Sequence, residues 1–109
     1  TCGVIKAGTE IPFDQYFYSC NQKYNLVLQH DGNLCSYGDQ GPAWCTGTYD
    51  KPVATAKMQA DGDLQVLGPN GEVRFSSGTH GYPDAYFQIG DDGVMRIFSG
   101  GVKRWQGIP

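Results

Sequence analysis

The chain has 109 residues and a net charge of −3, a length that favours a single domain and a charge that argues against a nucleic-acid partner. Glycine occurs 16 times and charged residues make up only 17% of the chain, which is typical of a turn-rich β protein and not of a disordered segment. No apolar run is long enough to cross a membrane, so the sequence predicts no membrane span.

The N-terminal part, residues 1–23, is the least patterned region. Residues 1–5 predict a short strand, residues 6–9 a turn, and the aromatic-rich stretch 11–20 one or two further short strands. The chain opens without a charged start followed by an apolar run, so we expect a mature product from which a leader has been removed.

From residue 24 onward the chain repeats itself, over approximately residues 24–48, 54–79 and 85–107. Each repeat contains an Asp-Gly pair, at positions 31–32, 61–62 and 92–93. Because glycine accepts positive φ and aspartate bonds nearby backbone groups, each pair predicts a tight turn. Each repeat is therefore interpreted as strand, turn, strand, hairpin and strand, and no helical periodicity is present.

Alternation of apolar and polar residues separates the two faces of the predicted sheets. The inward-facing residues are expected to be Leu26, Leu28, Leu34, Met58, Leu64, Val66, Phe87, Ile89, Met95 and Ile97. If Tyr37 pairs with Ala43 in the first hairpin, then Ser36 faces Trp44 and shares its face. We therefore expect the large aromatic residue of each repeat to point inward and to meet the others near a pseudo-threefold axis: Trp44, Phe75 and Trp105.

The stretch 29–37 has polar or small residues at every second position, and these side chains are predicted to project from one face of a strand: Gln29, Asp31, Asn33, Cys35 and Tyr37. Two amides, a carboxylate and a phenol supply the donors and acceptors that suit a polyhydroxylated ligand such as a sugar. Alternate polar positions are also the ordinary solvent-facing side of a one-sided sheet, and this simpler interpretation stays open.

This stretch resembles the Gln-x-Asp-x-Asn-x-Val-x-Tyr mannose motif of the bulb-type, or snowdrop-type, lectins, with Cys35 at the valine position. The resemblance extends over residues 3–107 and implies one all-β domain spanning residues 1–109. The implied fold is a β-prism of three four-stranded antiparallel sheets with pseudo-threefold symmetry, the bulb-type lectin fold.

The resemblance also implies that this stretch, which we call site one, binds mannose-type glycans without a metal or other cofactor. Gln29 and Asp31 would contact the axial 2-hydroxyl region of the sugar, and Asn33 and Tyr37 the 4-hydroxyl side. Glycans or glycoproteins are therefore the expected partners.

The equivalent positions in the other repeats depart from the motif. The second repeat has Gln59, Asp61, Asp63, Gln65 and Leu67, so the phenol is lost and Asp63 can accept but cannot donate a hydrogen bond. The third repeat retains only the aspartate, within the series Gly90, Asp92, Val94, Arg96 and Phe98. We expect a degenerate second site and no sugar at the third.

Four cysteines without a Cys-x-x-Cys spacing predict two disulfides, and hence a secreted, extracellular protein. The hairpin register above places Cys35 opposite Cys45, within disulfide reach, and leaves Cys2 to pair with Cys20. The other two connectivities stay open. This pairing differs from the usual disulfide of the family, which joins the motif strand to the start of the second repeat.

Other chemistry is disfavoured. We predict no enzyme, because a catalytic thiol needs a base in contact with it and His30 is predicted to point to the opposite face from Cys35. A calcium loop beginning at Asp61 is disfavoured because Val66 stands where such a loop needs glycine.

The main alternative function is a secreted protein-interaction module of the defence, toxin or effector type, which binds a protein receptor on a scaffold that has lost sugar binding. A weaker alternative is a taste- or inhibitor-type relative that uses the surface of the second and third repeats. Members of the family commonly form homodimers by exchanging a C-terminal strand. Because this chain ends four residues after Trp105, we expect any such exchange to be truncated.

Overall fold

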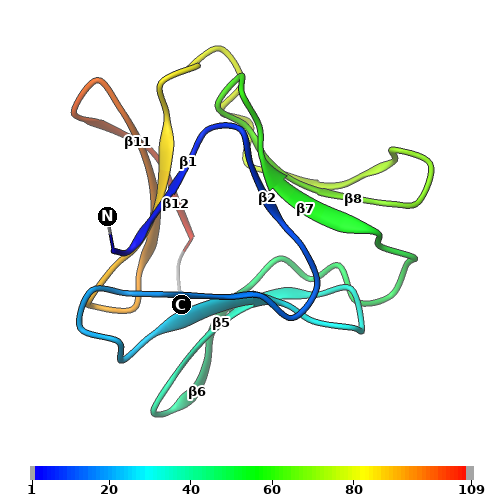
Figure 1. The fold of residues 1–109 in the computed structure, drawn as a ribbon, viewed down its shortest axis with the longest axis horizontal. Helices are drawn as coiled ribbons and strands as arrows, with labels where there is room; N and C mark the ends of the chain where they lie inside the picture. The colour runs from blue at the N-terminus through cyan, green and yellow to red at the C-terminus, as the bar shows by residue number, and fades with distance from the viewer. Residues whose placement is uncertain (1, 108–109) are drawn as a thin grey trace.

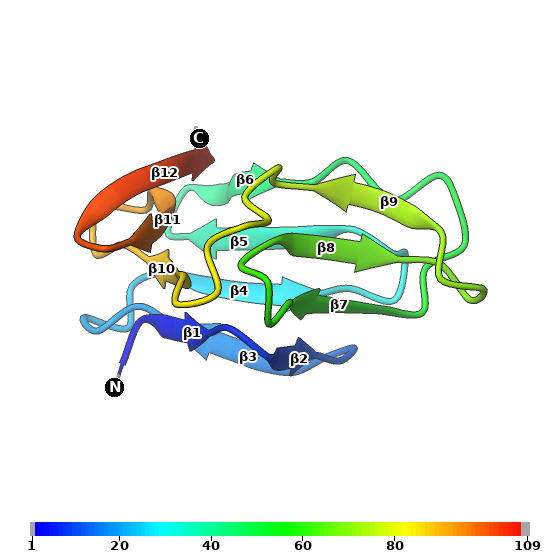
Figure 2. The ribbon, with the colours of Figure 1, turned by 90° about the horizontal axis from the view of Figure 1, so that it is seen from above.

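The computed structural model describes residues 2–107, which form three four-stranded antiparallel sheets and contain no helix. Figure 1 shows the sheets as the three sides of a prism. Figure 2 shows the strands stacked along the prism, from β1, β2 and β3 at one end to β6, β9 and β12 at the other. The predicted fold class is therefore confirmed; Thr1, part of the first predicted strand, lies outside the described residues.

Each repeat supplies three consecutive strands to its own sheet. The first-repeat sheet contains β4 (Asn25–Leu28), β5 (Leu34–Gly38) and β6 (Gly41–Cys45). The second-repeat sheet contains β7 (Thr55–Met58), β8 (Leu64–Leu67) and β9 (Val73–Ser76). The third-repeat sheet contains β10 (Tyr86–Ile89), β11 (Met95–Ser99) and β12 (Val102–Gly107).

The N-terminal segment adds the fourth strand to every sheet. β1 (Val4–Lys6) pairs with β10, β2 (Thr9–Ile11) with β7, and β3 (Tyr16–Tyr18) with β4. The turn predicted at residues 6–9 is present at Ala7 and Gly8, but Thr9 already belongs to β2. One short segment thus ties the three repeats together.

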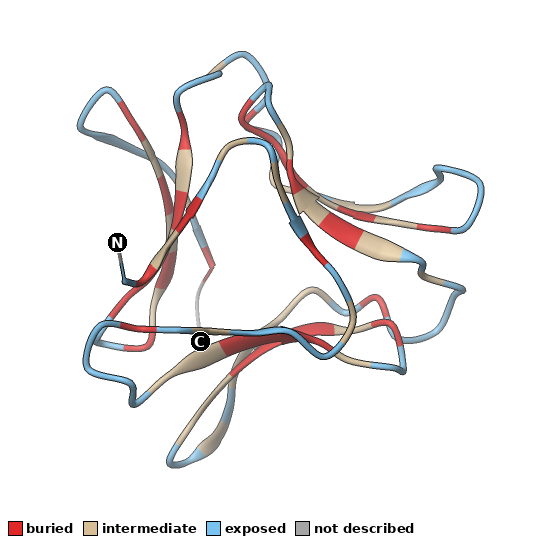
Figure 3. Ribbon diagram, viewed as in Figure 1, coloured by how far each residue is buried: buried red, intermediate tan, exposed pale blue. Residues whose placement is uncertain are grey.

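The core lies between the sheets. Every residue predicted to face inward by alternation is buried, in agreement with Figure 3, where buried segments lie along the strands and exposed segments in the connecting loops. Trp44, Phe75 and Trp105 meet edge to face, with ring centroids 5.3 to 6.3 Å apart. This geometry favours aromatic attraction. The predicted aromatic centre is therefore confirmed, and Phe87 joins it at 6.1 Å from Trp105.

The first hairpin contains a bulge that the sequence analysis did not anticipate. Tyr37 pairs with Pro42 and not with Ala43, because the two-residue turn after β5 brings Gly38 opposite Gly41. The register then shifts by one residue, so that Ser36 lies opposite Trp44 and Cys35 opposite Cys45, as predicted. Ala43 is the extra residue of a β-bulge, a common way to absorb such a mismatch.

The prediction that residues 29–37 form one continuous strand is wrong. β4 ends at Leu28, and bonds of 2.9 Å from Gln29 N to Asn33 O and from Gly32 N to Gln29 O close a turn. Gly32 has φ of +91°, and a Cβ there would lie 3.0 Å from a methyl carbon of Val53. Strand alternation therefore begins only at β5, and the Asp-Gly turn predicted for this repeat is present.

Candidate functional site

Site one lies on the outer face of the first-repeat sheet. Val27 and Cys35 are paired there across β4 and β5, yet they are only 3% and 1% exposed. Gln29 and Tyr37 occupy the positions on either side of this pair, and Gln29 Nε2 donates a hydrogen bond to Tyr37 Oη. The contact between Gln29 and Tyr37 runs diagonally over Val27 and Cys35, which explains why these two residues are buried. The structure thus brings two of the predicted site residues together.

The Cys35–Cys45 disulfide lies on this outer face, and Cys2 is bonded to Cys20, so the predicted connectivity is confirmed. Cys35 is buried and Cys45 is half-buried, so only the Cys45 side of the disulfide reaches the surface. It joins β5 to β6 on the sheet that carries site one. Its contribution is to hold the hairpin, while polar groups form the accessible surface.

The oxygen and the nitrogen of the Asn33 side-chain amide differ in their hydrogen bonding. Its Oδ1 accepts hydrogen bonds from Gly47 N (2.9 Å) and Thr48 N (3.2 Å), and a longer one from Thr46 Oγ1 (3.4 Å). No hydrogen bond from its Nδ2 is found within the described part of the chain. The amide oxygen therefore fixes the loop after β6, and the amide N–H groups remain able to donate to a ligand.

Asp31 is exposed at the tip of the turn, where its Oδ1 accepts a hydrogen bond of 2.9 Å from Asn33 N. No hydrogen bond to its second carboxylate oxygen is found among residues 2–107, so this oxygen is able to accept one from a ligand. The contacts join Gln29 to Tyr37 and Asp31 to the backbone of Asn33, and the four side chains carry both donors and acceptors. This set can hydrogen-bond to adjacent hydroxyl groups of one small ligand without a metal ion.

Thr46 and Thr48 are functional supports that the sequence analysis missed. Thr48 Oγ1 donates to Gly32 O at 2.6 Å and lies 2.7 Å from Thr46 Oγ1, so these hydroxyls connect the loop to the site-one turn. A signal was present in the sequence, because Thr46-Gly47-Thr48 recurs as Ser77-Gly78-Thr79 after the aromatic residue of the second repeat. The same bond recurs there, from Thr79 Oγ1 to Gly62 O at 2.6 Å.

In the second repeat, Asp63 takes the place of Asn33 and is only 2% exposed. Its Oδ1 accepts from Ser77 Oγ (2.9 Å) and Thr79 N (3.2 Å). Its Oδ2 accepts from Ser76 Oγ (2.7 Å) and Gln65 Nε2 (2.9 Å). Burial acts to raise the pKa of the Asp63 carboxyl, but these hydrogen bonds outweigh it and hold the pKa below its usual value. Both carboxylate oxygens are thus occupied by the fold.

In the third repeat, an ion pair between Asp92 and Arg96 occupies the surface that is equivalent to site one. Arg96 Nη2 lies 2.7 Å from Asp92 Oδ2, and the hydrogen bond from Arg96 holds the pKa of Asp92 below its usual value. Gly90 stands where the first repeat has Gln29, and a Cβ there would lie only 2.8 Å from Arg96 Nη1. Glycine therefore leaves the space that the ion pair occupies.

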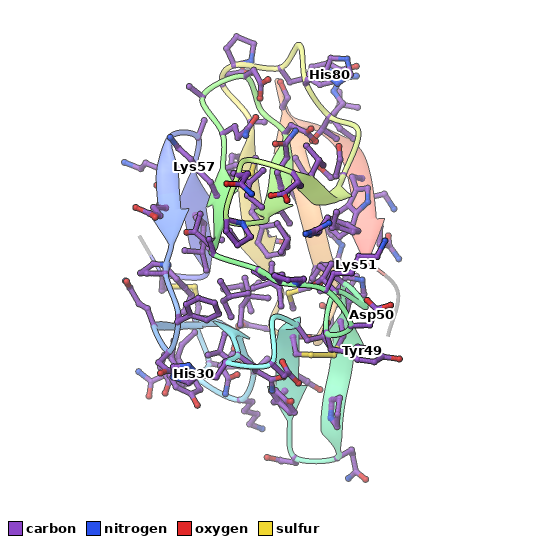
Figure 4. All side chains as sticks on the ribbon, turned by 90° about the vertical axis from the view of Figure 1, so that its right-hand side faces the viewer. His30, Tyr49, Asp50, Lys51, Lys57 and His80 are labelled. Atoms are coloured by element: carbon purple, nitrogen blue, oxygen red, sulfur yellow. A yellow bond between two sulfur atoms is a disulfide. The ribbon has the colours of Figure 1, made fainter. Side chains whose placement is uncertain are left out.

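The histidines lie apart from the cysteines and from each other. Figure 4 places His30 and His80 at opposite ends of the molecule. His30 contacts the Asp14 carboxylate and stacks on Phe13, with ring centroids 5.5 Å apart. Within residues 2–107, no group of three or more His, Cys, Asp or Glu side chains is arranged to hold a metal ion. No helix long and apolar enough to span a membrane occurs in the same region.

Comparisons with known proteins agree with this architecture. The lectin of Marasmius oreades superposes with a TM-score of 0.87 at 19% identity, covering 97% of this chain and 90% of the lectin. The mannose-specific agglutinin of snowdrop (Galanthus nivalis), solved with methyl-α-D-mannoside, has a TM-score of 0.77 at 24% identity, covering 94% of this chain and 93% of the agglutinin.

A sequence relative is the B-type lectin plumieribetin of Scorpaena plumieri, which is 31% identical over 80 residues, or 73% of this chain. The match spans 63% of that lectin, less than two thirds of its length. No model of a protein family matches the chain. The resemblance predicted from the motif and the repeats is nevertheless confirmed by these relatives, and the chain has the β-prism fold of the bulb-type, mannose-binding lectins.

Proposed function

We propose that this domain is a non-catalytic lectin that binds mannose-type glycans at site one. The observation that carries the proposal is the difference between Asn33 and Asp63. The Asn33 amide keeps N–H donors to which residues 2–107 offer no acceptor, whereas both oxygens of Asp63 accept hydrogen bonds from its neighbours. The snowdrop agglutinin, which shares the fold, was solved with a mannoside, and this supports mannose as the sugar.

The proposed site is shallow, and one such site should bind a single mannose unit with a dissociation constant of about 1 mM. Useful affinity would then come from several glycan branches or several copies of the domain acting together. Secretion is part of the proposal, because two disulfides persist best in an oxidising compartment. Cell-surface or secreted glycoproteins are therefore the proposed partners.

An NMR titration of labelled protein with methyl mannoside tests this function. We expect saturable shifts at Gln29, Asp31, Asn33 and Tyr37, with few changes in the second and third repeats. Tyr37→Phe removes one hydroxyl and should weaken binding, while Tyr86→Phe on the third-repeat sheet serves as the matched control. The absence of shifts at tens of millimolar mannoside, about ten times the expected constant, would refute sugar binding. The scaffold would then be assigned to protein recognition.

A further inference from the structure

Two tyrosines stand next to site one without a role in the core. Tyr16 and Tyr18 lie on β3, the edge strand of the first-repeat sheet, and remain 52% and 49% exposed. Their rings are stacked, with centroids 6.3 Å apart and planes inclined by 22°. An exposed aromatic pair beside the proposed binding site is a candidate contact surface for a ligand.

The register of the sheet connects these tyrosines to site one. Tyr18 pairs with Asn25, which pairs with Tyr37, so the three side chains form one row across the outer face. Tyr16 begins the adjacent row, opposite Val27 and in line with Cys35. The tyrosine pair is thus two strand spacings, about 10 Å, from the β5 residues of site one. Adjacent units of a short oligosaccharide can span this distance.

Two further features make this surface suitable for a ligand. A hollow of about 320 Å³ lies along the free side of β3, lined by Tyr16, Tyr18, Val4 and the Cys2–Cys20 disulfide. In the row between Tyr18 and Tyr37, the Asn25 Oδ1 atom is buried and accepts no hydrogen bond from the described residues. An acceptor without a donor is costly at a buried position, and a small rearrangement that brings a hydroxyl group to it would remove this cost.

We propose that Tyr16 and Tyr18 form a second subsite, which receives the next pyranose unit of an oligosaccharide whose first unit occupies site one. The proposal rests on the function proposed above. The apolar C–H face of a pyranose stacks on the tyrosine rings, and its hydroxyl groups point to solvent and toward the Asn25 row. Direct stacking removes apolar area of both partners from water without requiring a charged group. The subsite therefore selects for linked glycans over free mannose.

The test compares a monosaccharide with a trisaccharide in the same titration. Methyl mannoside and a linear mannose trisaccharide are titrated into the wild-type domain and into the double variant Tyr16→Ala/Tyr18→Ala, with binding followed by NMR. We expect the trisaccharide to bind the wild type about tenfold more tightly than methyl mannoside, from two stacking contacts. The double variant should lose this tenfold gain and keep its affinity for methyl mannoside.

Two controls distinguish stacking from other effects. Tyr16→Phe/Tyr18→Phe keeps the rings and should retain the gain, and Tyr86→Ala removes a ring from the stacked Tyr86–Phe98 pair on another sheet and should also retain it. An unchanged ratio of the two affinities in the double alanine variant would overturn the subsite while leaving site one intact. Failure of the wild type to bind either sugar would overturn the proposed function itself, and the subsite with it.

Discussion

Replacing Asn33 by aspartate should weaken sugar binding while leaving the fold intact. In the first repeat, the fold uses only Oδ1 of Asn33, which accepts hydrogen bonds from the loop at Thr46, Gly47 and Thr48. Asp63 shows that a carboxylate oxygen can take the loop-facing role, because its Oδ1 accepts hydrogen bonds from Ser77 Oγ and Thr79 N. The donors to its Oδ2, Gln65 and Ser76, are replaced by the Cys35–Cys45 disulfide in the first repeat, so the fold does not occupy the second carboxylate oxygen there. Asn33→Asp therefore keeps the oxygen that accepts hydrogen bonds from the loop, and it replaces the NH₂ donor by an acceptor oxygen.

The size of the effect follows from the loss of one donor. A sugar oxygen that accepted from Nδ2 would face a carboxylate oxygen, and an unsatisfied polar contact in a binding site costs about 1–3 kcal/mol. This corresponds to a loss of affinity of about 5- to 150-fold. The free energy of unfolding should change by only about 0.5 kcal/mol, because the bonds to the loop are kept.

Titration with methyl mannoside and a thermal melt of the same sample measure both effects. Asp63→Asn is the matched control, since it introduces the same amide into a repeat that has Leu67 where site one has Tyr37, and it should add no mannose binding. If Asn33→Asp bound mannoside as well as the wild type, the Asn33 N–H would not contact the sugar. A large loss of stability in this variant would refute the assignment of a structural role to Asn33 Oδ1 alone.

Three further predictions concern stability. The pKa of Asp63 is lower in the folded than in the unfolded chain. The ionised carboxylate therefore stabilises the fold at pH values above the unfolded-state pKa, and this stabilisation is lost as the pH falls through the folded-state pKa. Thermal melts from pH 7 to pH 2 should show this loss in the wild type, and the Asp63→Asn variant should lack it. Removing the second disulfide with Cys35→Ala/Cys45→Ala should cost about 2–3 kcal/mol, measured by urea unfolding, and an unchanged midpoint would contradict this. Trp44→Ala opens the aromatic centre and should cost about 3–5 kcal/mol in the same assay, whereas the exposed Val73→Ala should cost less than about 1 kcal/mol.

The alternation of residues predicted the core because burial on one face of a strand is a local property. Leu26 and Leu28 share a face because they are two residues apart on β4, and Leu34 shares that face because it pairs directly with Leu28. The aromatic centre could be predicted because one large ring recurs in each repeat. The alternation did not reveal that Gln29 to Asn33 form a turn, because the polar residues of that turn also fall at every second position.

Features that depend on two separate segments could not be read from the pattern. The bulge at Ala43 arises because the turn length and the Cys35–Cys45 register disagree by one residue, which neither segment shows alone. The contact between Gln29 and Tyr37 depends on their diagonal placement across β4 and β5. Asn33 Oδ1 is bonded and Asn33 Nδ2 is left to donate only because the loop at Thr48 folds back onto the turn.

The way in which the N-terminal strands are shared has a consequence for synthesis on the ribosome. Val4 pairs with Gln88, so β1 is synthesised long before its partner strand β10. At about 5–20 residues per second, that interval lasts several seconds, during which β1 has no partner strand. Unpaired strand edges template aggregation. Nascent chains of this domain should therefore depend on chaperones that bind early, and premature termination in the third repeat would leave β1 permanently exposed.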